Sequence, residues 1–264
     1  MNLATDSKER FTNRVDDYVR FRPGYPPEVT GVLRDECGLT SASVIADIGS
    51  GTGLLTQLFL ENGNLVYGVE PNAAMRHAGE EVLKKYSRFR SVAGSAESTT
   101  LPEASAGFVV AGQAFHWFDR AAAFREFVRI LKPQGWVALI WNERNLDGSP
   151  FMLEYDRILR RHGPGYPGNR HAYAGSGKLG DFFASSDARS REFDNPQVLG
   201  WEGIKGRLMS ASYAPQPGEP QHDSMIEDLK KAFAANQTDN RVTMFYRAMI
   251  HYGRLGNRVD GKDA

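Results

Sequence analysis

Short apolar runs alternate with amphipathic stretches through the first half of the chain. Each run has the length of a buried strand, and the stretches between the runs space their apolar residues as helices do. This alternation predicts an α/β fold built on a parallel sheet with helices on both faces. The predicted strands are 44–48, 65–69, 89–93, 108–111 and 136–141, and the predicted helices are 28–36, 54–61, 73–86 and 121–131.

The alternation stops after Asn142. Residues 162–180 carry six glycines and two prolines, which is typical of a long irregular connection, and such connections often close over a site. We expect one domain over 31–264, in which 143–188 is a lid or a substrate-site insertion, preceded by an amino-terminal arm over 1–30. The further expected elements are helices at 151–161, 201–209 and 224–235 and strands at 189–193 and 242–252.

A glycine-rich turn joins the first predicted strand to the helix that follows it. Residues 44–53 read VIADIGSGTG. Glycine permits positive φ and lets a ligand lie against bare main chain, and this turn falls outside the carboxyl ends of the strands, where open α/β sheets bind ligands. Glu70 ends the second predicted strand, at the place where a carboxylate accepts hydrogen bonds from ribose hydroxyls in nucleotide-binding folds. The combination predicts a nucleoside cofactor, whereas the glycines alone are also typical of a tight turn without a ligand.

Two cofactor classes fit this turn, and its charge separates them. A dinucleotide site has the spacing GxGxxG, but here the glycines are Gly49, Gly51 and Gly53, so the third comes one residue early. Asp47 stands directly before the turn, where its charge would repel a pyrophosphate and would suit an ammonium group. The residues therefore favour a nucleoside that carries an amino acid over NAD.

Three motifs together resemble those of class I S-adenosylmethionine-dependent methyltransferases of the broad small-molecule group. They are DIGSGTG at 47–53, EPN at 70–72 and ILKPQG at 130–135. The flanking segments are similar to the subgroup that includes trans-aconitate methyltransferase-like proteins. The residues concerned are Phe11, Tyr18, RPGYP at 22–26, GSAE at 94–97 and QAFHWF at 113–118.

The resemblance covers residues 10 to 142 and continues more weakly to 242–255, which looks like the antiparallel last strand of that fold. It implies a Rossmann-like, seven-stranded, mostly parallel sheet with that antiparallel last strand, helices on both faces and a small helical cap. It also implies that the amino-terminal arm folds over the cofactor.

The cofactor that the resemblance implies is S-adenosyl-L-methionine, with S-adenosyl-L-homocysteine as the product. This sequence departs from the family at Ser95, where an acid usually receives the adenine amino group; serine can still accept one hydrogen bond. The residues expected to bind the cofactor are Tyr18, Arg22, Asp47, Gly49, Ser50, Gly51, Thr52, Gly53, Glu70, Pro71, Met75, Ser95, Ala96, Glu97, Gln113 and Ala114.

The segment after the fourth predicted strand would lie where the sulfonium points. Phe115, His116, Trp117 and Asn142 are the expected substrate-site residues, and His116 is the candidate base or orienting group. A base is needed only where the acceptor atom carries a proton at neutral pH. The alternative for His116 and Trp117 is that they pack beneath the next helix.

Composition limits the partners. Lys plus Arg and Asp plus Glu both count 32, so no net charge favours nucleic acid or an acidic membrane. The single cysteine, Cys37, fits a reducing cytoplasm, and no stretch has the length of a signal-peptide core or a membrane span. We expect a cytoplasmic protein that binds a small-molecule substrate, with no nucleic acid, membrane or metal partner. The oligomeric state is not predicted.

The sequence thus predicts S-adenosylmethionine-dependent methyl transfer to a small-molecule acceptor, whose reacting atom is a carboxylate, hydroxyl, amine or carbon. Two alternatives remain at this point. One is a non-catalytic protein that binds the same cofactor, and the other, disfavoured by the glycine spacing and Asp47, is an NAD-type oxidoreductase.

Overall fold

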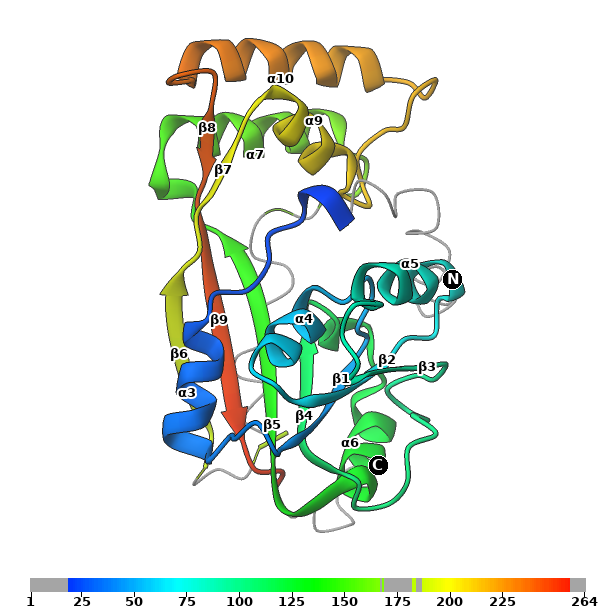
Figure 1. Cartoon of the computed structure of the whole chain (residues 1–264). Coiled ribbons are helices and arrows are strands. Elements are labelled where there is room, and N and C mark those ends of the chain that lie inside the picture. Colours follow the sequence, from blue (N-terminus) through cyan, green and yellow to red (C-terminus); the bar gives the residue numbers. More distant parts are fainter. Residues whose placement is uncertain (1–18, 167, 169–181, 184–186, 257–264) are drawn as a thin grey trace, which may run out of the picture.

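Seven strands form one sheet at the centre of the molecule (Figure 1). The computed structural model describes residues 19–166, 168, 182–183 and 187–256. The first five strands are parallel, and β9 runs antiparallel to both of its neighbours, β5 and β6. The predicted mostly parallel sheet with one antiparallel strand is therefore confirmed. In sheet order the strands are β3 (Phe89–Val92), β2 (Leu65–Val69), β1 (Val44–Ile48), β4 (Ala106–Gly112), β5 (Leu131–Arg144), β9 (Tyr246–Gly253) and β6 (Arg189–Asp194).

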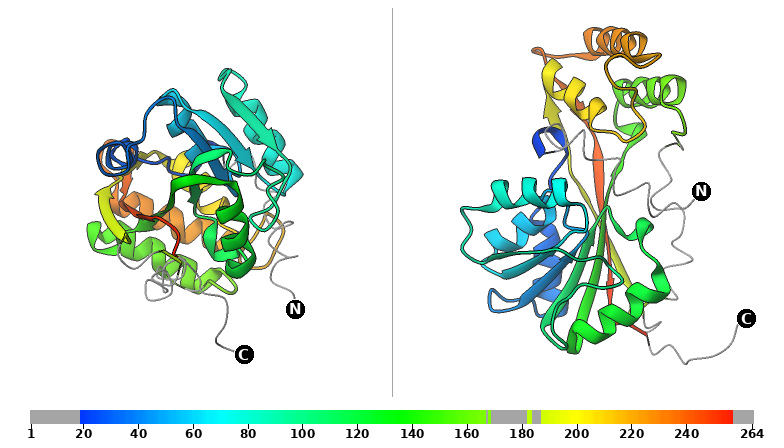
Figure 2. Two further views of the ribbon diagram at one scale, coloured as in Figure 1. Left: turned by 90° about the horizontal axis from the view of Figure 1, so that it is seen from below. Right: turned by 90° about the vertical axis from the view of Figure 1, so that its right-hand side faces the viewer.

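Helices cover both faces of the sheet, as predicted (Figure 2). Alternate residues of each strand point to opposite faces, so Ile45 packs with one helical layer while Ala46 packs with the other. On the face of Ile45 lie α3 (Glu28–Cys37), α4 (Leu54–Glu61) and the end of α5 (Ala73–Leu83), and on the face of Ala46 lies α6 (Arg120–Ile130).

Strand β5 begins earlier than predicted. Its pairing with β4 jumps from Ala106–Leu131 to Phe108–Trp136, so residues 132–135 loop out of the ladder, and Gln134 in this loop has φ +64°. The end of the ILKPQG motif, residues 132–135, thus forms an irregularity within the strand. Hydrogen bonding with β4 extends the strand on its amino-terminal side, which local turn chemistry does not show.

The predicted strand 242–252 is divided in the structure. Its first part is β8 (Val242–Met244), which pairs with β7 (Gln197–Leu199) in a separate two-stranded sheet, and Phe245 separates it from β9. The apolar run is continuous in the sequence, and only the pairing partners of its two halves distinguish them.

A cap lies beyond the carboxyl ends of the parallel strands (Figure 1). It consists of β7, β8 and three helices: α7 (Pro150–His162), α9 (Trp201–Met209) and α10 (His222–Asn236). These elements share a hydrophobic cluster that includes Tyr155, Leu208 and Leu229 and is separate from the clusters on the sheet. The small helical cap is confirmed, and it extends well beyond 143–188. Within that predicted lid, residues 167, 169–181 and 184–186 lie outside the described part of the chain.

Local sequence explains where α7 begins and ends. The Ser149 hydroxyl accepts a hydrogen bond from the Met152 amide, and Pro150 occupies the first turn, where its missing N–H costs nothing. Arg160, Arg161 and His162 fall in the last turn, where positive charge favours the helix dipole.

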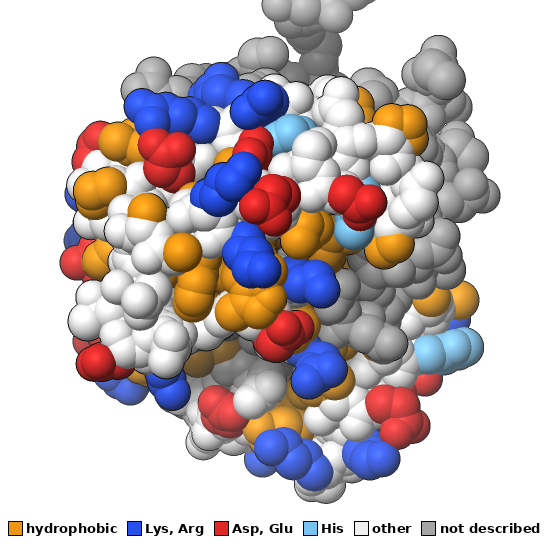
Figure 3. All heavy atoms as spheres, turned by 90° about the horizontal axis from the view of Figure 1, so that it is seen from above, with side chains coloured by type: hydrophobic (Ala, Val, Ile, Leu, Met, Phe, Trp, Pro, Cys, Tyr) orange, Lys and Arg blue, Asp and Glu red, His pale blue; other side chains and the backbone are white. Residues whose placement is uncertain are grey.

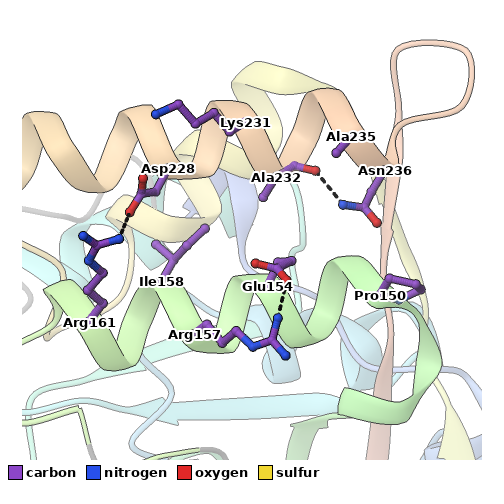
Figure 4. Close-up of a pocket in the computed structure, with 10 residues that line it drawn as sticks. All are labelled: Pro150, Glu154, Arg157, Ile158, Arg161, Asp228, Lys231, Ala232, Ala235 and Asn236. Atoms are coloured by element: carbon purple, nitrogen blue, oxygen red, sulfur yellow. Dashed lines mark hydrogen bonds and ion pairs between the residues drawn. The ribbon is translucent and has the colours of Figure 1, made fainter.

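The outer face of the cap carries both signs of charge (Figure 3). A groove between α7 and α10 is lined by the Arg161–Asp228 ion pair, at 3.2 Å, and by the Arg157–Glu154 pair (Figure 4). None of the predicted site residues lines this groove. Among the helices that the structure describes, none combines the length and the apolar composition needed to cross a bilayer.

Candidate active site at the glycine turn

The glycine turn follows β1 at the carboxyl edge of the sheet. Gly49, Gly51 and Gly53 all have positive φ, at +70°, +57° and +88°. A Cβ on Gly49 would lie 2.6 Å from the Cβ of Ala114, and one on Gly53 would lie 2.5 Å from Leu83 Cδ1. These two glycines therefore permit close packing as well as a left-handed backbone. The turn presents its main chain beside the end of β4, as predicted.

Asp47 is fully buried at the base of this turn. Its Oδ2 accepts a hydrogen bond from the Thr56 hydroxyl at 2.6 Å, while its Oδ1 has no hydrogen-bond partner in the described ranges of the chain. Burial raises the pKa of Asp47 to about 7, the Thr56 hydrogen bond opposes this rise, and the charge of Glu70 adds to it. A buried acceptor without a partner is costly, so this oxygen fits a ligand that brings a hydrogen-bond donor or an ammonium group.

Glu70 braces the turn from the end of β2. Its Oε2 accepts from the Gly51 amide at 2.9 Å and its Oε1 accepts from the Asn72 amide at 2.8 Å. Burial raises the pKa of Glu70, and these two backbone hydrogen bonds counteract the rise. Each carboxylate oxygen retains a second acceptor site. The predicted contact with ribose hydroxyls is thus compatible with a bracing role that sequence reasoning did not foresee.

The remaining predicted residues around the turn differ in exposure. The Ser50 amide donates to the Val69 carbonyl at 3.2 Å, and the Thr52 hydroxyl is buried without a hydrogen-bond partner from the described residues. Met75 is 6% exposed and borders Gly51, whereas Pro71 is exposed. A cofactor could therefore meet an apolar side chain at Met75 and an orphaned hydroxyl at Thr52.

The loop predicted to border the adenine follows β3. Ser95 and Ser98 form an isolated β-bridge, and Ala96 is buried at their centre. Glu97 accepts the Asp119 amide at 3.0 Å, which ties this loop to the start of α6. These bonds hold the loop in place. The contact of Ser95 with adenine stays a prediction.

A buried carboxylate that sequence reasoning missed fixes the same loop. Glu126 of α6 accepts hydrogen bonds from the amide and hydroxyl of Thr99 and from Arg129. Burial acts to raise the pKa of Glu126, but hydrogen bonds from Arg129 and Thr99 lower it to about 2. The available signal was an acid on the apolar face of a predicted helix, between Phe124 and Phe127.

Gln113 and Asn142 come together where β4 and β5 end. Gln113 has φ +56°, and its side-chain amide donates to the Asn142 carbonyl at 2.9 Å. The Asn142 amide donates to the Gly24 carbonyl at 2.9 Å, and its Oδ1 accepts from Asn195 at 2.9 Å. Asn142, expected at the substrate, therefore uses its side chain to hold the segment around Gly24 against the sheet.

The residues after β4 divide between core and surface. Phe115 is 2% exposed and packs edge-to-face against Trp141 and Phe182, so it is a core residue rather than an open substrate contact. The rings of His116 and Trp117 lie beside each other, with centroids 4.8 Å apart and planes tilted by 43°, and His116 is exposed. Surrounding protein nevertheless disfavours the charged imidazolium, and this desolvation lowers the pKa of His116 to about 4.

The amino-terminal segment runs between the sheet and the cap. Arg22 donates to the Ser210 carbonyl at 2.7 Å, and the Phe21 ring lies against Gly206 of α9, where a Cβ would come within 2.1 Å of it. Tyr18 lies outside the described residues. Contacts of Tyr18 and Arg22 with a cofactor remain predictions.

Residues 46–139 match the family model described as a methyltransferase domain. This segment is similar to methyltransferase domains. The chain is 35% identical over 155 residues to an uncharacterised methyltransferase of Schizosaccharomyces pombe, covering 57% of this chain and 59% of that protein. It is 34% identical over 158 residues to an uncharacterised methyltransferase of Mycobacterium tuberculosis, covering 60% and 62%. The chain thus spans about three fifths of the length of these relatives.

Solved structures share the fold of this chain. A candidate type II methyltransferase of Anaeromyxobacter dehalogenans aligns with a TM-score of 0.67 at 22% identity, over 90% of this chain and all of that one. A candidate methyltransferase from an antibiotic biosynthesis pathway of Anabaena variabilis aligns with a TM-score of 0.58 at 20% identity, over 89% and 99%. The Rossmann-like methyltransferase fold is therefore confirmed.

Proposed function

We propose that the chain transfers a methyl group from S-adenosylmethionine to a small-molecule acceptor. The observation that carries the proposal is the buried, half-satisfied carboxylate of Asp47 beside the glycine turn of a methyltransferase domain. Its free Oδ1 suits the ammonium end of this cofactor and would oppose a pyrophosphate. The NAD-type alternative has neither this charge nor the domain match in its favour.

The residues present fit this cofactor along its length. Asp47 and the glycine main chain would hold its amino-acid part, Glu70 would accept from the ribose hydroxyls, and the loop around Ala96 would border its base. When bound, the cofactor supplies a methyl group already activated by the sulfonium charge. The protein then has to align the acceptor and exclude water, which is the part of catalysis that positioning provides.

The pKa of His116, at about 4, constrains the acceptor. At neutral pH the imidazole is uncharged and only weakly basic, so it is a poor base for an acceptor that holds its proton tightly. A carboxylate acceptor is already ionised at neutral pH and needs no base, so it is one of the acceptor classes to test. The cap beyond the strand ends supports a small acceptor, and the balanced charge of the chain speaks against a polyanion.

Methyl transfer is tested with S-adenosylmethionine labelled in its methyl group and a panel of small carboxylates, phenols and amines. We expect labelled product from at least one carboxylate with the wild type and none with Asp47→Asn. If the chain binds S-adenosyl-L-homocysteine but transfers no methyl group to any acceptor, the result would instead support a non-catalytic binding protein. A change of nicotinamide fluorescence on mixing with NADH would favour the oxidoreductase.

A further inference from the structure

Two arginines lie among tyrosines where the cap meets the sheet. Arg144 is the last residue of β5, and Arg207 belongs to α9. Figure 1 shows that β5 and β9 reach the cap that contains α9. We call the group the arginine–tyrosine cluster; its members are Arg144, Tyr155, Tyr166, Arg207, Tyr213 and Tyr246.

Arg207 is a buried cation without a carboxylate partner. It is 6% exposed, its Nε donates to the Tyr246 hydroxyl at 2.8 Å, and its Nη1 lies 3.4 Å from the Ser210 hydroxyl. Its guanidinium also lies 5.6 Å from the centroid of the Tyr246 ring. No ion pair joins Arg207 to an acid in the described chain. A buried charge is costly unless an opposite charge pairs with it, and phenol groups compensate it only in part.

Tyr155 adds a second unsatisfied group to the cluster. Its side chain is fully buried, yet its hydroxyl has no hydrogen-bond partner among the residues that the structure describes. The charge of Arg207 acts on this hydroxyl, and the guanidinium of Arg144 lies 5.7 Å from the ring centroid. Burial raises the pKa of Tyr155 to about 12, so the hydroxyl keeps its proton at neutral pH and can donate it.

The acid that bonds to the cluster, Asp156, already has a cationic partner. Asp156 pairs with Arg160 at 2.6 Å and also accepts from the Tyr166 hydroxyl, which in turn accepts from Arg144. Asp156 therefore compensates Arg160 and the outer side of the cluster, and it forms no ion pair with Arg207.

The cluster stands above the edge of the sheet that carries the glycine turn. Arg144 follows two residues after Asn142, whose carbonyl accepts from Gln113 at the end of β4. Arg144, Tyr166 and Tyr213 are partly exposed, whereas Arg207, Tyr155 and Tyr246 are buried behind them. The cluster thus has a side open to solvent and a buried side rich in hydrogen-bond donors.

We infer that Arg207, Tyr155 and Arg144 form a subsite for an anionic group, a carboxylate or a phosphate, of the methyl acceptor. The inference rests on the proposed function for the identity of the ligand. A guanidinium group binds either anion with paired N–H donors, and the Tyr155 hydroxyl supplies one more. The anionic group serves as an anchor that orients the acceptor. Because Arg207 has no carboxylate partner and the Tyr155 hydroxyl no hydrogen-bond partner in the described part of the chain, the subsite discriminates against neutral analogues.

Calorimetry on the full chain tests the subsite, with inorganic phosphate and succinate as probes against sodium chloride of equal ionic strength. We expect at least one probe to bind the wild type. Arg207→Met should weaken its Kd at least tenfold and Tyr155→Phe several-fold. Arg161→Met, which removes an equal charge from an exposed position on the cap, should leave it unchanged. The probe with the lower Kd for the wild type identifies the preferred anion as carboxylate or phosphate.

Binding of S-adenosyl-L-homocysteine is measured on the same samples, and its Kd should stay within twofold of the wild-type value in all variants. The inference is overturned if neither probe binds the wild type beyond the chloride control, or if the variants bind the probe as the wild type does. Tyr155→Phe removes only an unpartnered hydroxyl, so it decides the matter should Arg207→Met fail to fold. If a probe binds but S-adenosyl-L-homocysteine does not, the result would support an anion site and would rule out a methyl acceptor as its ligand.

Discussion

Replacing Asp47 by Asn should stabilise the ligand-free protein while it abolishes cofactor binding. Asp47 is fully buried with one oxygen unpaired, and burial raises its pKa from 3.8 to about 7. That difference corresponds to about 4 kcal/mol of destabilisation of the folded state at pH 8, as an upper bound. An Asn amide keeps the bond from Thr56 but leaves its own N–H groups unpaired, which costs about 1–3 kcal/mol. The net gain is therefore about 1–3 kcal/mol.

The pH dependence gives the sign of this effect. Because the folded state holds the Asp47 proton more tightly, its contribution favours folding below pH 4 and is lost as the pH rises toward 7. Urea unfolding at pH 5 and pH 8 should therefore show a larger advantage of Asp47→Asn at pH 8. Asp35→Asn, at an exposed position in α3, is the control and should show no such difference. An advantage that does not grow with pH would refute the assignment of a raised pKa to Asp47.

Three further predictions concern the turn, the adenine loop and the histidine. Gly49→Ala should lower the free energy of unfolding, measured in urea, by about 2–4 kcal/mol, because the new Cβ would clash with Ala114 at a position of positive φ. The control is Gly38→Ala, where φ is +72° and a Cβ would meet no heavy atom within 4 Å; it should cost less than half as much. Glu126→Gln should lower the free energy of unfolding by about 1–3 kcal/mol at pH 7. Because the pKa of Glu126 is depressed in the folded state, this difference should shrink as the pH falls from about 4.5 toward 2. An equal difference at all pH values would contradict this prediction. The imidazole resonances of His116 should titrate in NMR with a midpoint near 4, and a midpoint near 6.5 would show that the ring is not desolvated.

The turn and its strand were predictable because their signals are local. A buried apolar run, three glycines at alternate positions and two acids at strand ends determine the geometry within about 25 residues. The parallel order follows from the alternation of strands and helices. The glycine turn, Asp47 and Glu70 therefore lie together as the sequence predicts.

Other parts of the site depend on contacts between distant residues. Asn142 holds the main chain of Gly24, 118 positions away, so its role was not visible in its own neighbourhood. Phe115 is in the core because Phe182 and Trp141 pack against it. Arg207 meets Tyr246 across 39 positions, within a cap whose elements come from 143–188 and from the residues that follow it. Helical spacing predicts the faces of these elements but not which faces meet.

Titration calorimetry of the folded full chain with S-adenosyl-L-homocysteine tests the central claim most directly. We predict binding of one ligand per chain to the wild type, and at least a hundredfold weaker binding to Asp47→Asn. Absence of binding to folded wild-type protein would contradict the claim that the glycine turn and Asp47 form a site for the methyl donor.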